Sequence, residues 1–268
     1  MREIGLYELK IIQMDVLSAV HEFCIEKGIK YSLGCGTMLG CARHGGYIPW
    51  DDDIDIYLLR EDYNKLIELF PESYKGHYKL LSLERTPSWN RAYAKAYDTR
   101  TVFQEESSFT HELGVNIDIF PIDEVPEESN RWLHYNKYRR LLQHVYELKI
   151  MVFRKERTWM KNLFLALTKI VLFFVSSRTL AEWIQRMAVK FNGTGSGLVF
   201  ENCLGVLQKR PFNKALFQQL IPLKFEDREF MAFADYDAYL TNGFGDWRKL
   251  PPKEKQVTHH AFKAWWKD

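Results

Sequence analysis

Residues 34–57 read GCGTMLGCARHGGYIPWDDDIDIY, and this segment is the most informative part of the chain. A turn of small residues, Gly34, Gly36 and Thr37, comes shortly before a dense group of acids. The acids occupy four of five consecutive positions: Asp51, Asp52, Asp53 and Asp55. Because like charges this close together repel one another, the pattern favours a bound cation over a purely structural role.

The acids run into a predicted strand at residues 53–59, which are otherwise β-branched, aromatic or apolar. Alternate side chains of a strand share a face, so we expect Asp53 and Asp55 to point the same way. All-oxygen ligands favour Mg²⁺, or Mn²⁺, over zinc or copper. A hard ion held by few carboxylates keeps positions open for phosphate oxygens, which is typical of metal-dependent phosphoryl or nucleotidyl transfer.

A third carboxylate is expected from a second predicted strand, residues 115–120, which ends at Pro121. Asp118 is an isolated acid in this apolar segment, where a charge is costly unless it is paired or bound to metal. The alternative is a salt bridge from Asp118 to a nearby Arg or Lys. We therefore expect Asp53, Asp55 and Asp118 to be the metal ligands.

Upstream, Gly36 and Thr37 follow a short predicted strand at residues 30–33 and open a predicted helix at residues 37–43. Glycines let backbone N–H groups approach a phosphate, and the start of a helix adds favourable partial charge. An ordinary turn is the alternative. The acids that follow favour a phosphate-binding role.

These residues resemble the LicD family of phosphocholine transferases, which belongs to the nucleotidyltransferase superfamily and includes the fukutin-like proteins. The family pattern G-T-L-L-G-x-x-R-H-x-G-x-I-P-W-D-D-D-I-D is met by Gly36, Thr37, Leu39, Gly40, Arg43, His44, Gly46, Ile48, Pro49, Trp50, Asp51, Asp52, Asp53, Ile54 and Asp55. The resemblance continues through Lys95 and Asp98, through Asp118, and through a C-terminal element at residues 236–252 with Lys255, His259 and His260 beyond it. Cys35, Met38 and Phe244 depart mildly from the pattern, and no carboxylate is missing.

The resemblance implies an α/β (α+β) fold with a nucleotidyltransferase-like mixed sheet and an appended helical region. We expect a catalytic core at residues 1–125 and a mostly helical region at residues 126–268, whose C-terminal motif completes the site. The implied reaction moves phosphocholine from CDP-choline onto a sugar of a bacterial cell-surface glycan, of the lipopolysaccharide or teichoic acid type, or onto its lipid-linked precursor. Related proteins move ribitol or glycerol phosphate, so the CDP-linked donor stays open.

Roles for individual residues follow as hypotheses. Mg²⁺ on its three expected ligands would bridge the donor diphosphate, and Asp51 or Asp52 would bind a second ion or accept the proton of the attacking hydroxyl. The expected substrate-binding residues are Gly36, Thr37, Arg43, His44, Lys95, Asp246 and His260. Arg43 and Lys95 carry donors that suit phosphate oxygens. A surface ion pair or a turn is the alternative role for each.

Two other classes are weighed against this one. A glycosyltransferase can hold a nucleotide sugar through Asp-x-Asp and Mn²⁺, but its motif normally follows a longer nucleotide-binding half. An EF-hand calcium loop is excluded because its sixth position, counted from Asp51, would be Ile56 rather than glycine.

Composition limits the partners and the location. The chain has 268 residues and a formal net charge of +2, which argues against nucleic acid as a partner. Its four cysteines have no C-x-x-C spacing and are expected to be buried thiols. The N-terminal segment has helical apolar spacing rather than a secretory pattern, so we expect a cytoplasmic protein, or one held peripherally on the inner face of the plasma membrane.

An apolar run between Lys161 and Arg178 contains one charge, Lys169. The run is shorter than the roughly 20 apolar residues that a membrane span needs. Two interpretations stay open for residues 162–177. The segment is either a core helix packed against a long predicted helix at residues 129–157, or an interfacial helix that docks on a membrane.

Overall fold

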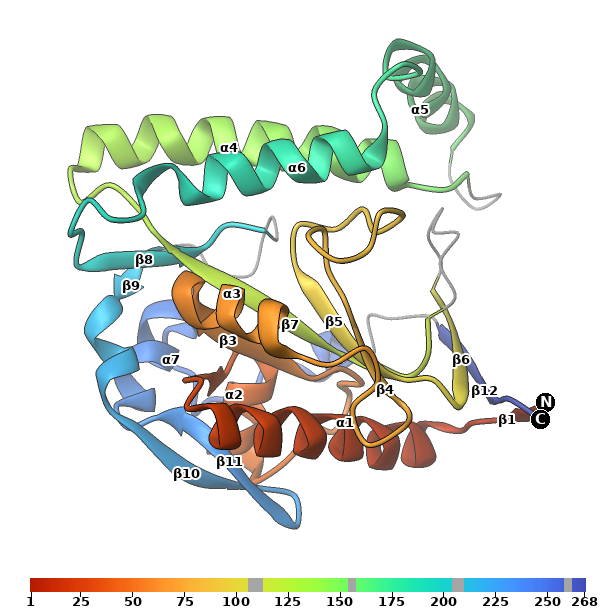
Figure 1. The fold of residues 1–268 in the computed structure, drawn as a ribbon. Coiled ribbons are helices and arrows are strands. Elements are labelled where there is room, and N and C mark those ends of the chain that lie inside the picture. The colour runs from red at the N-terminus through yellow and green to blue at the C-terminus, as the bar shows by residue number, and fades with distance from the viewer. Residues whose placement is uncertain (106–112, 154–157, 204–209, 258–261) are drawn as a thin grey trace.

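The computed structural model describes residues 1–105, 113–153, 158–203, 210–257 and 262–268, and it has a mixed α/β architecture (Figure 1). The helices are α1 (Leu6–Lys27), α2 (Cys35–His44), α3 (Arg60–Leu69), α4 (Ser129–Ile150), α5 (Trp159–Val171), α6 (Ser177–Ala188) and α7 (Tyr236–Phe244), with short 3-10 turns η1 (Val189–Phe191), η2 (Lys214–Gln218) and η3 (Lys253–Lys255). The strands are β1 (Arg2–Glu3), β2 (Ser32–Leu33), β3 (Asp55–Leu59), β4 (Tyr78–Leu81), β5 (Ala94–Asp98), β6 (Thr101–Glu105), β7 (Asn116–Glu124), β8 (Leu198–Glu201), β9 (Phe212–Asn213), β10 (Leu220–Phe225), β11 (Arg228–Phe233) and β12 (Phe262–Trp266). The expected fold class is confirmed.

The central sheet has seven strands. Five follow the order β2-β3-β7-β5-β4, and β8 pairs with both β7 and β9. β3 and β7 are parallel, whereas the other pairs of this sheet are antiparallel. Strand β8, from the expected C-terminal region, pairs with β7, from the expected catalytic core. One sheet therefore contains strands from both sides of the expected division between residues 125 and 126.

Strand β7 continues past Pro121, where the sequence predicts an end. The N–H of Asp118 donates toward β3, so the position of Pro121, three residues on, faces the opposite side of β7. On that side β5 pairs only as far as Ile119, and β8 begins to pair at Ile122. Pro121 falls in the gap between the two strands, and its missing N–H therefore removes no sheet hydrogen bond.

Helix α1 begins after Gly5 and ends at Gly28, whose backbone is left-handed (φ 62°) and therefore suits glycine. Its apolar residues at helical spacing, including Leu9, Val16 and Val20, are fully buried. Figure 1 shows α1 below the sheet and the antiparallel helices α4 and α6 side by side above it.

Two smaller β units complete the molecule. β10 and β11 form a hairpin, and β1, β12 and β6 form a separate sheet that brings the two termini side by side (Figure 1). Sequence reasoning missed these strands. The long helix expected at residues 129–157 ends at Ile150, and residues 154–157 lie outside the described part.

The four cysteines are buried and free, as expected. Within the described ranges, no helix combines the length and apolar character needed to cross a bilayer.

Candidate functional site

Three neighbouring strands carry the charged groups of the site. β3 begins at Asp55, which lies opposite Asp118 of the parallel strand β7. Lys95 of β5 lies opposite Asp118 in the antiparallel pairing. The strand starts two residues later than the sequence predicts, so Asp53 lies on the segment that leads into it. The sheet therefore gathers residues whose positions in the chain are far apart.

Lys95 is the cation among these strands. Its Nζ lies 2.6 Å from Oδ1 of Asp118 and donates to Oδ1 of Asn116 at 2.8 Å. The lysine side chain is 6% exposed and that of Asp118 is 17% exposed, so little water screens the pair. The alternative role for Asp118, a salt bridge, is therefore observed in the structure.

The acids before β3 form a compact cluster. Asp51, Asp52 and Asp53 each offer a carboxylate oxygen, and these oxygens lie within 4.8 Å of one another. Burial raises the pKa of Asp55 well above its usual value, and the charges of Asp53, Asp118 and Asp51 raise it further, in that order. A divalent cation would relieve this repulsion. The oxygen-only donor set therefore fits Mg²⁺ or Mn²⁺.

The start of α2 fixes the first residue of β3. Thr37 is buried, and its hydroxyl accepts the N–H of Asp55 at 2.8 Å. The N–H of Gly34 donates to the carbonyl of Asp55 at 2.9 Å. A Cβ at Gly36 would lie 2.7 Å from Oδ2 of Asp51, so glycine leaves room for that carboxylate. The turn thus positions the acids directly, and a phosphate contact by Gly36 and Thr37 stays a prediction.

Arg43 and His44 lie at the other end of α2. Nε of Arg43 donates to Nε2 of His44 at 3.0 Å, and Nη1 donates to the carbonyl of Trp247 at 3.0 Å. This links α2 to the C-terminal element, where Asp246 is exposed beside Trp247. Arg43 lies seven positions after Gly36 along the helix, a rise of about 10 Å. His260 lies outside the described residues.

Sequence reasoning missed residues of α1 beside the acids. Gln13 is buried, and its Nε2 donates to the carbonyl of Asp52 at 2.9 Å. Lys10 is partly buried, and this burial lowers its pKa. The nearby charges of Asp51, Glu226 and Asp52 oppose that shift only in part. A polar Gln13 within an apolar helical stripe was an available signal.

Glu226 was also missed. It lies in the β10–β11 turn with a left-handed backbone (φ 57°), and its Oε1 accepts the N–H of Tyr47 at 2.9 Å. A Cβ at Gly46 would lie 2.2 Å from this Oε1. No local pattern links positions 46 and 226, because the contact arises only when the hairpin packs on the loop.

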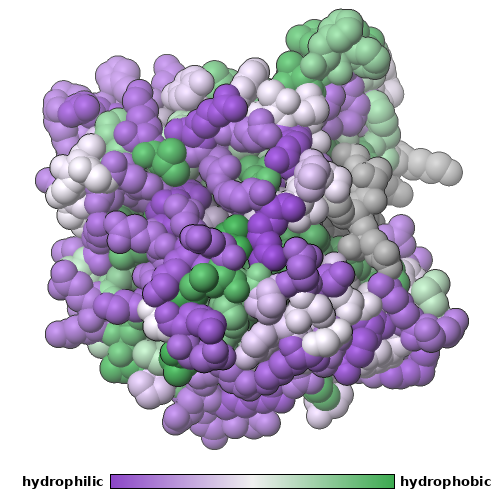
Figure 2. Space-filling model, in the orientation of Figure 1, coloured by the Kyte–Doolittle hydropathy of each residue, from purple (hydrophilic) through white to green (hydrophobic). Residues whose placement is uncertain are grey.

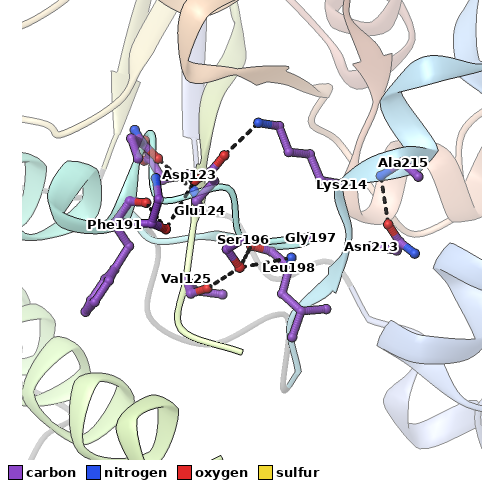
Figure 3. Close-up of polar contacts among 12 residues, drawn as sticks. Asp123, Glu124, Val125, Phe191, Ser196, Gly197, Leu198, Asn213, Lys214 and Ala215 are labelled. Carbon is purple, nitrogen blue, oxygen red and sulfur yellow. Dashed lines mark hydrogen bonds and ion pairs between the residues drawn. The ribbon is translucent and has the colours of Figure 1, made fainter. Parts of the chain in front are cut away.

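The acids at the far end of β7 are already paired. Asp123 accepts two hydrogen bonds from Arg60, at 2.8 and 2.7 Å, within the core. Figure 3 shows Glu124 reaching Lys214, at 2.7 Å, and Ser196 donating to the carbonyl of Val125 at 2.6 Å. These contacts join β7 to the later strands. Asp123 and Glu124 therefore act in structure, in contrast to the acid cluster near Asp55.

Together, a mixed sheet in which β3 begins at Asp55 opposite Asp118 of β7, an aspartate cluster and a glycine-containing helix start form the candidate site of an α/β protein. The family model described as LicD/FKTN/FKRP, nucleotidyltransferase domain, matches residues 28–165. The lipopolysaccharide cholinephosphotransferase LicD of Haemophilus influenzae is 30% identical over 267 residues, 99% of both chains. The human ribitol 5-phosphate transferase FKRP is 51% identical over 35 residues, 13% of this chain and 7% of that protein.

The chain belongs to the LicD family and is an enzyme, a transferase.

Proposed function

We propose that this protein transfers phosphocholine from CDP-choline onto a sugar of a bacterial cell-surface glycan or its lipid-linked precursor. The observation that carries the proposal is the acid cluster just before β3, whose first residue, Asp55, lies opposite Asp118, the partner of Lys95. The choice of donor group and acceptor class rests on similarity along nearly the whole chain to a lipopolysaccharide cholinephosphotransferase.

Asp53, Asp55 and Asp118 would hold Mg²⁺, or Mn²⁺, with Asp51 and Asp52 close enough to share a second ion. When bound, the ion supplies charge neutralisation for the donor diphosphate. The buried Asp55 supports this assignment, since its neighbours disfavour its charged form when no cation is present.

In the proposed reaction, the acceptor hydroxyl oxygen forms a bond to the phosphorus that bears choline. The bond from this phosphorus to the bridging oxygen breaks, and cytidine monophosphate leaves with the electron pair. Asp51 or Asp52 accepts the hydroxyl proton. Lys95 would exchange its contact with Asp118 for a donor phosphate oxygen, and Arg43 would bind phosphate from the far end of α2.

Two alternative reactions are tested beside this one. The first uses a donor that carries ribitol or glycerol phosphate, and its support is the 35-residue, 51% identical match to a ribitol 5-phosphate transferase. A glycosyltransferase that uses a nucleotide sugar is the runner-up reaction.

The test is isothermal titration calorimetry with CDP-choline, CDP-ribitol, CDP-glycerol and a nucleotide sugar, each with Mg²⁺ and with EDTA. The proposal expects magnesium-dependent binding that is tightest for CDP-choline. Preference for CDP-ribitol would change the donor but keep the mechanism. Binding of the nucleotide sugar alone would refute the proposed reaction.

A further inference from the structure

Helix α5 presents its apolar face to solvent rather than to the core. Helix α5 contacts α4, but of its residues only Leu165 is buried, at 1% exposure. Seven exposed side chains recur at helical spacing along α5 and the turn after it: Met160, Leu163, Phe164, Leu167, Ile170, Val171 and Phe174. Phe174 is 94% exposed. The surface view shows this apolar area at the upper right, over α5 (Figure 2).

The concentration is local to this segment. Residues 153–174 contribute ten of the 25 large apolar side chains that are exposed in the described parts of the chain. A stripe of this kind inside a globular protein would normally face the core. Helix α5 packs on α4, as one interpretation of residues 162–177 expects, but only Leu165 of α5 is buried, so this segment is not a core helix.

The charge within the run does not interrupt the apolar face. Nζ of Lys169 donates to the carbonyl of Lys149 at the end of α4, at 3.0 Å. Nζ of Lys149 donates in return to the carbonyl of Leu172, at 2.9 Å. Both ammonium groups thus bind helix C-terminal carbonyls between α4 and α5, where a positive charge is favourable. The outward stripe carries no charged residue.

The surrounding helical layer is basic. α4, α5 and α6 together contain nine Lys or Arg residues and two Glu residues, whereas the whole chain has 37 basic and 35 acidic residues. The exposed basic residues in and after these helices are Arg131, Lys137, Arg140, Lys161, Arg186 and Lys190. A groove between α4 and α6 is lined by Arg131, Trp183 and Lys190, among others, and by no acid.

We propose that α5 lies flat on an anionic lipid bilayer, with its outward stripe among the acyl chains and the basic helical layer facing the headgroups. The 13 residues of α5 span about 20 Å, too short for a hydrocarbon core of about 30 Å, so α5 rests in the interface without crossing it. An apolar face flanked by Lys, Arg and Trp is the composition that binds this interface. The charge of the layer selects anionic over zwitterionic lipid.

The experiment is co-sedimentation of the full chain with vesicles of equal parts phosphatidylglycerol and phosphatidylcholine, and with phosphatidylcholine alone. We expect binding to the anionic vesicles at low salt, and weaker binding as the salt concentration rises. Leu163→Glu should lower the partition coefficient by about tenfold or more, because it removes an inserted apolar group and adds repulsion. Its thermal stability should equal that of the wild type, because Leu163 is 51% exposed.

The matched control is Ile25→Glu, on α1, where the replaced side chain is 56% exposed. This variant should sediment with vesicles like the wild type. The proposal is wrong if the wild type stays in the supernatant at low salt, or if Leu163→Glu binds as well as Ile25→Glu. It is also overturned if sedimentation velocity shows a dimer that Leu163→Glu dissociates, because the stripe would then cover a second copy of the chain.

Discussion

Replacing Lys95 with methionine tests how far the site depends on neutralising its carboxylates. The substitution keeps the length and the apolar stem of the side chain and removes its charge. Asp118 then loses a partner 2.6 Å away in a largely buried setting. Breaking a buried pair costs about 3–5 kcal/mol, and the 17% exposure of Asp118 favours the lower end, about 3 kcal/mol. The melting temperature should fall by about 6 °C.

The assay is urea unfolding in EDTA, which keeps divalent ions from replacing the lost charge. Lys79→Met is the matched control, since Lys79 is exposed on the neighbouring strand β4 and should change stability by less than about 0.5 kcal/mol. Adding Asp118→Asn to Lys95→Met should recover about 2 kcal/mol, because no unpaired carboxylate remains. If Lys95→Met is as stable as Lys79→Met, the pair does not stabilise the fold and the reasoning fails.

Three further outcomes are expected. Asp55→Ala should lower turnover at least about a hundredfold while the metal-free protein stays folded, and wild-type turnover would contradict the metal assignment. Thr37→Val leaves the buried N–H of Asp55 without its 2.8 Å acceptor and should cost about 1–3 kcal/mol in chemical unfolding, whereas Thr37→Ser should behave like the wild type. Burial lowers the pKa of His21, so folding disfavours its protonation. The free energy of unfolding should fall as the pH drops below about 6.5, and it should change less with pH in His21→Gln. Chemical unfolding at a series of pH values measures both.

Much of the site could be predicted because its signals are local. The acids at positions 51–55 and the strand that follows are adjacent in sequence, and the helical spacing of apolar residues in the N-terminal segment predicts α1. Asp118 was found as an isolated acid in an apolar strand. The error at Pro121 arose because local rules cannot show that the proline falls between two partner strands.

The family, the fold class and the acid cluster can be predicted from the chain's residues, because these depend on residue types at short, ordered spacing. The pairing of Lys95 with Asp118, the contacts of Gln13 and Glu226 with the loop that contains the acids, and the outward apolar face of α5 are visible only in the folded molecule. Pairing partners and burial depend on which elements pack together. An apolar stripe has the same spacing whether it faces a core or a lipid surface, so its sequence cannot distinguish the two.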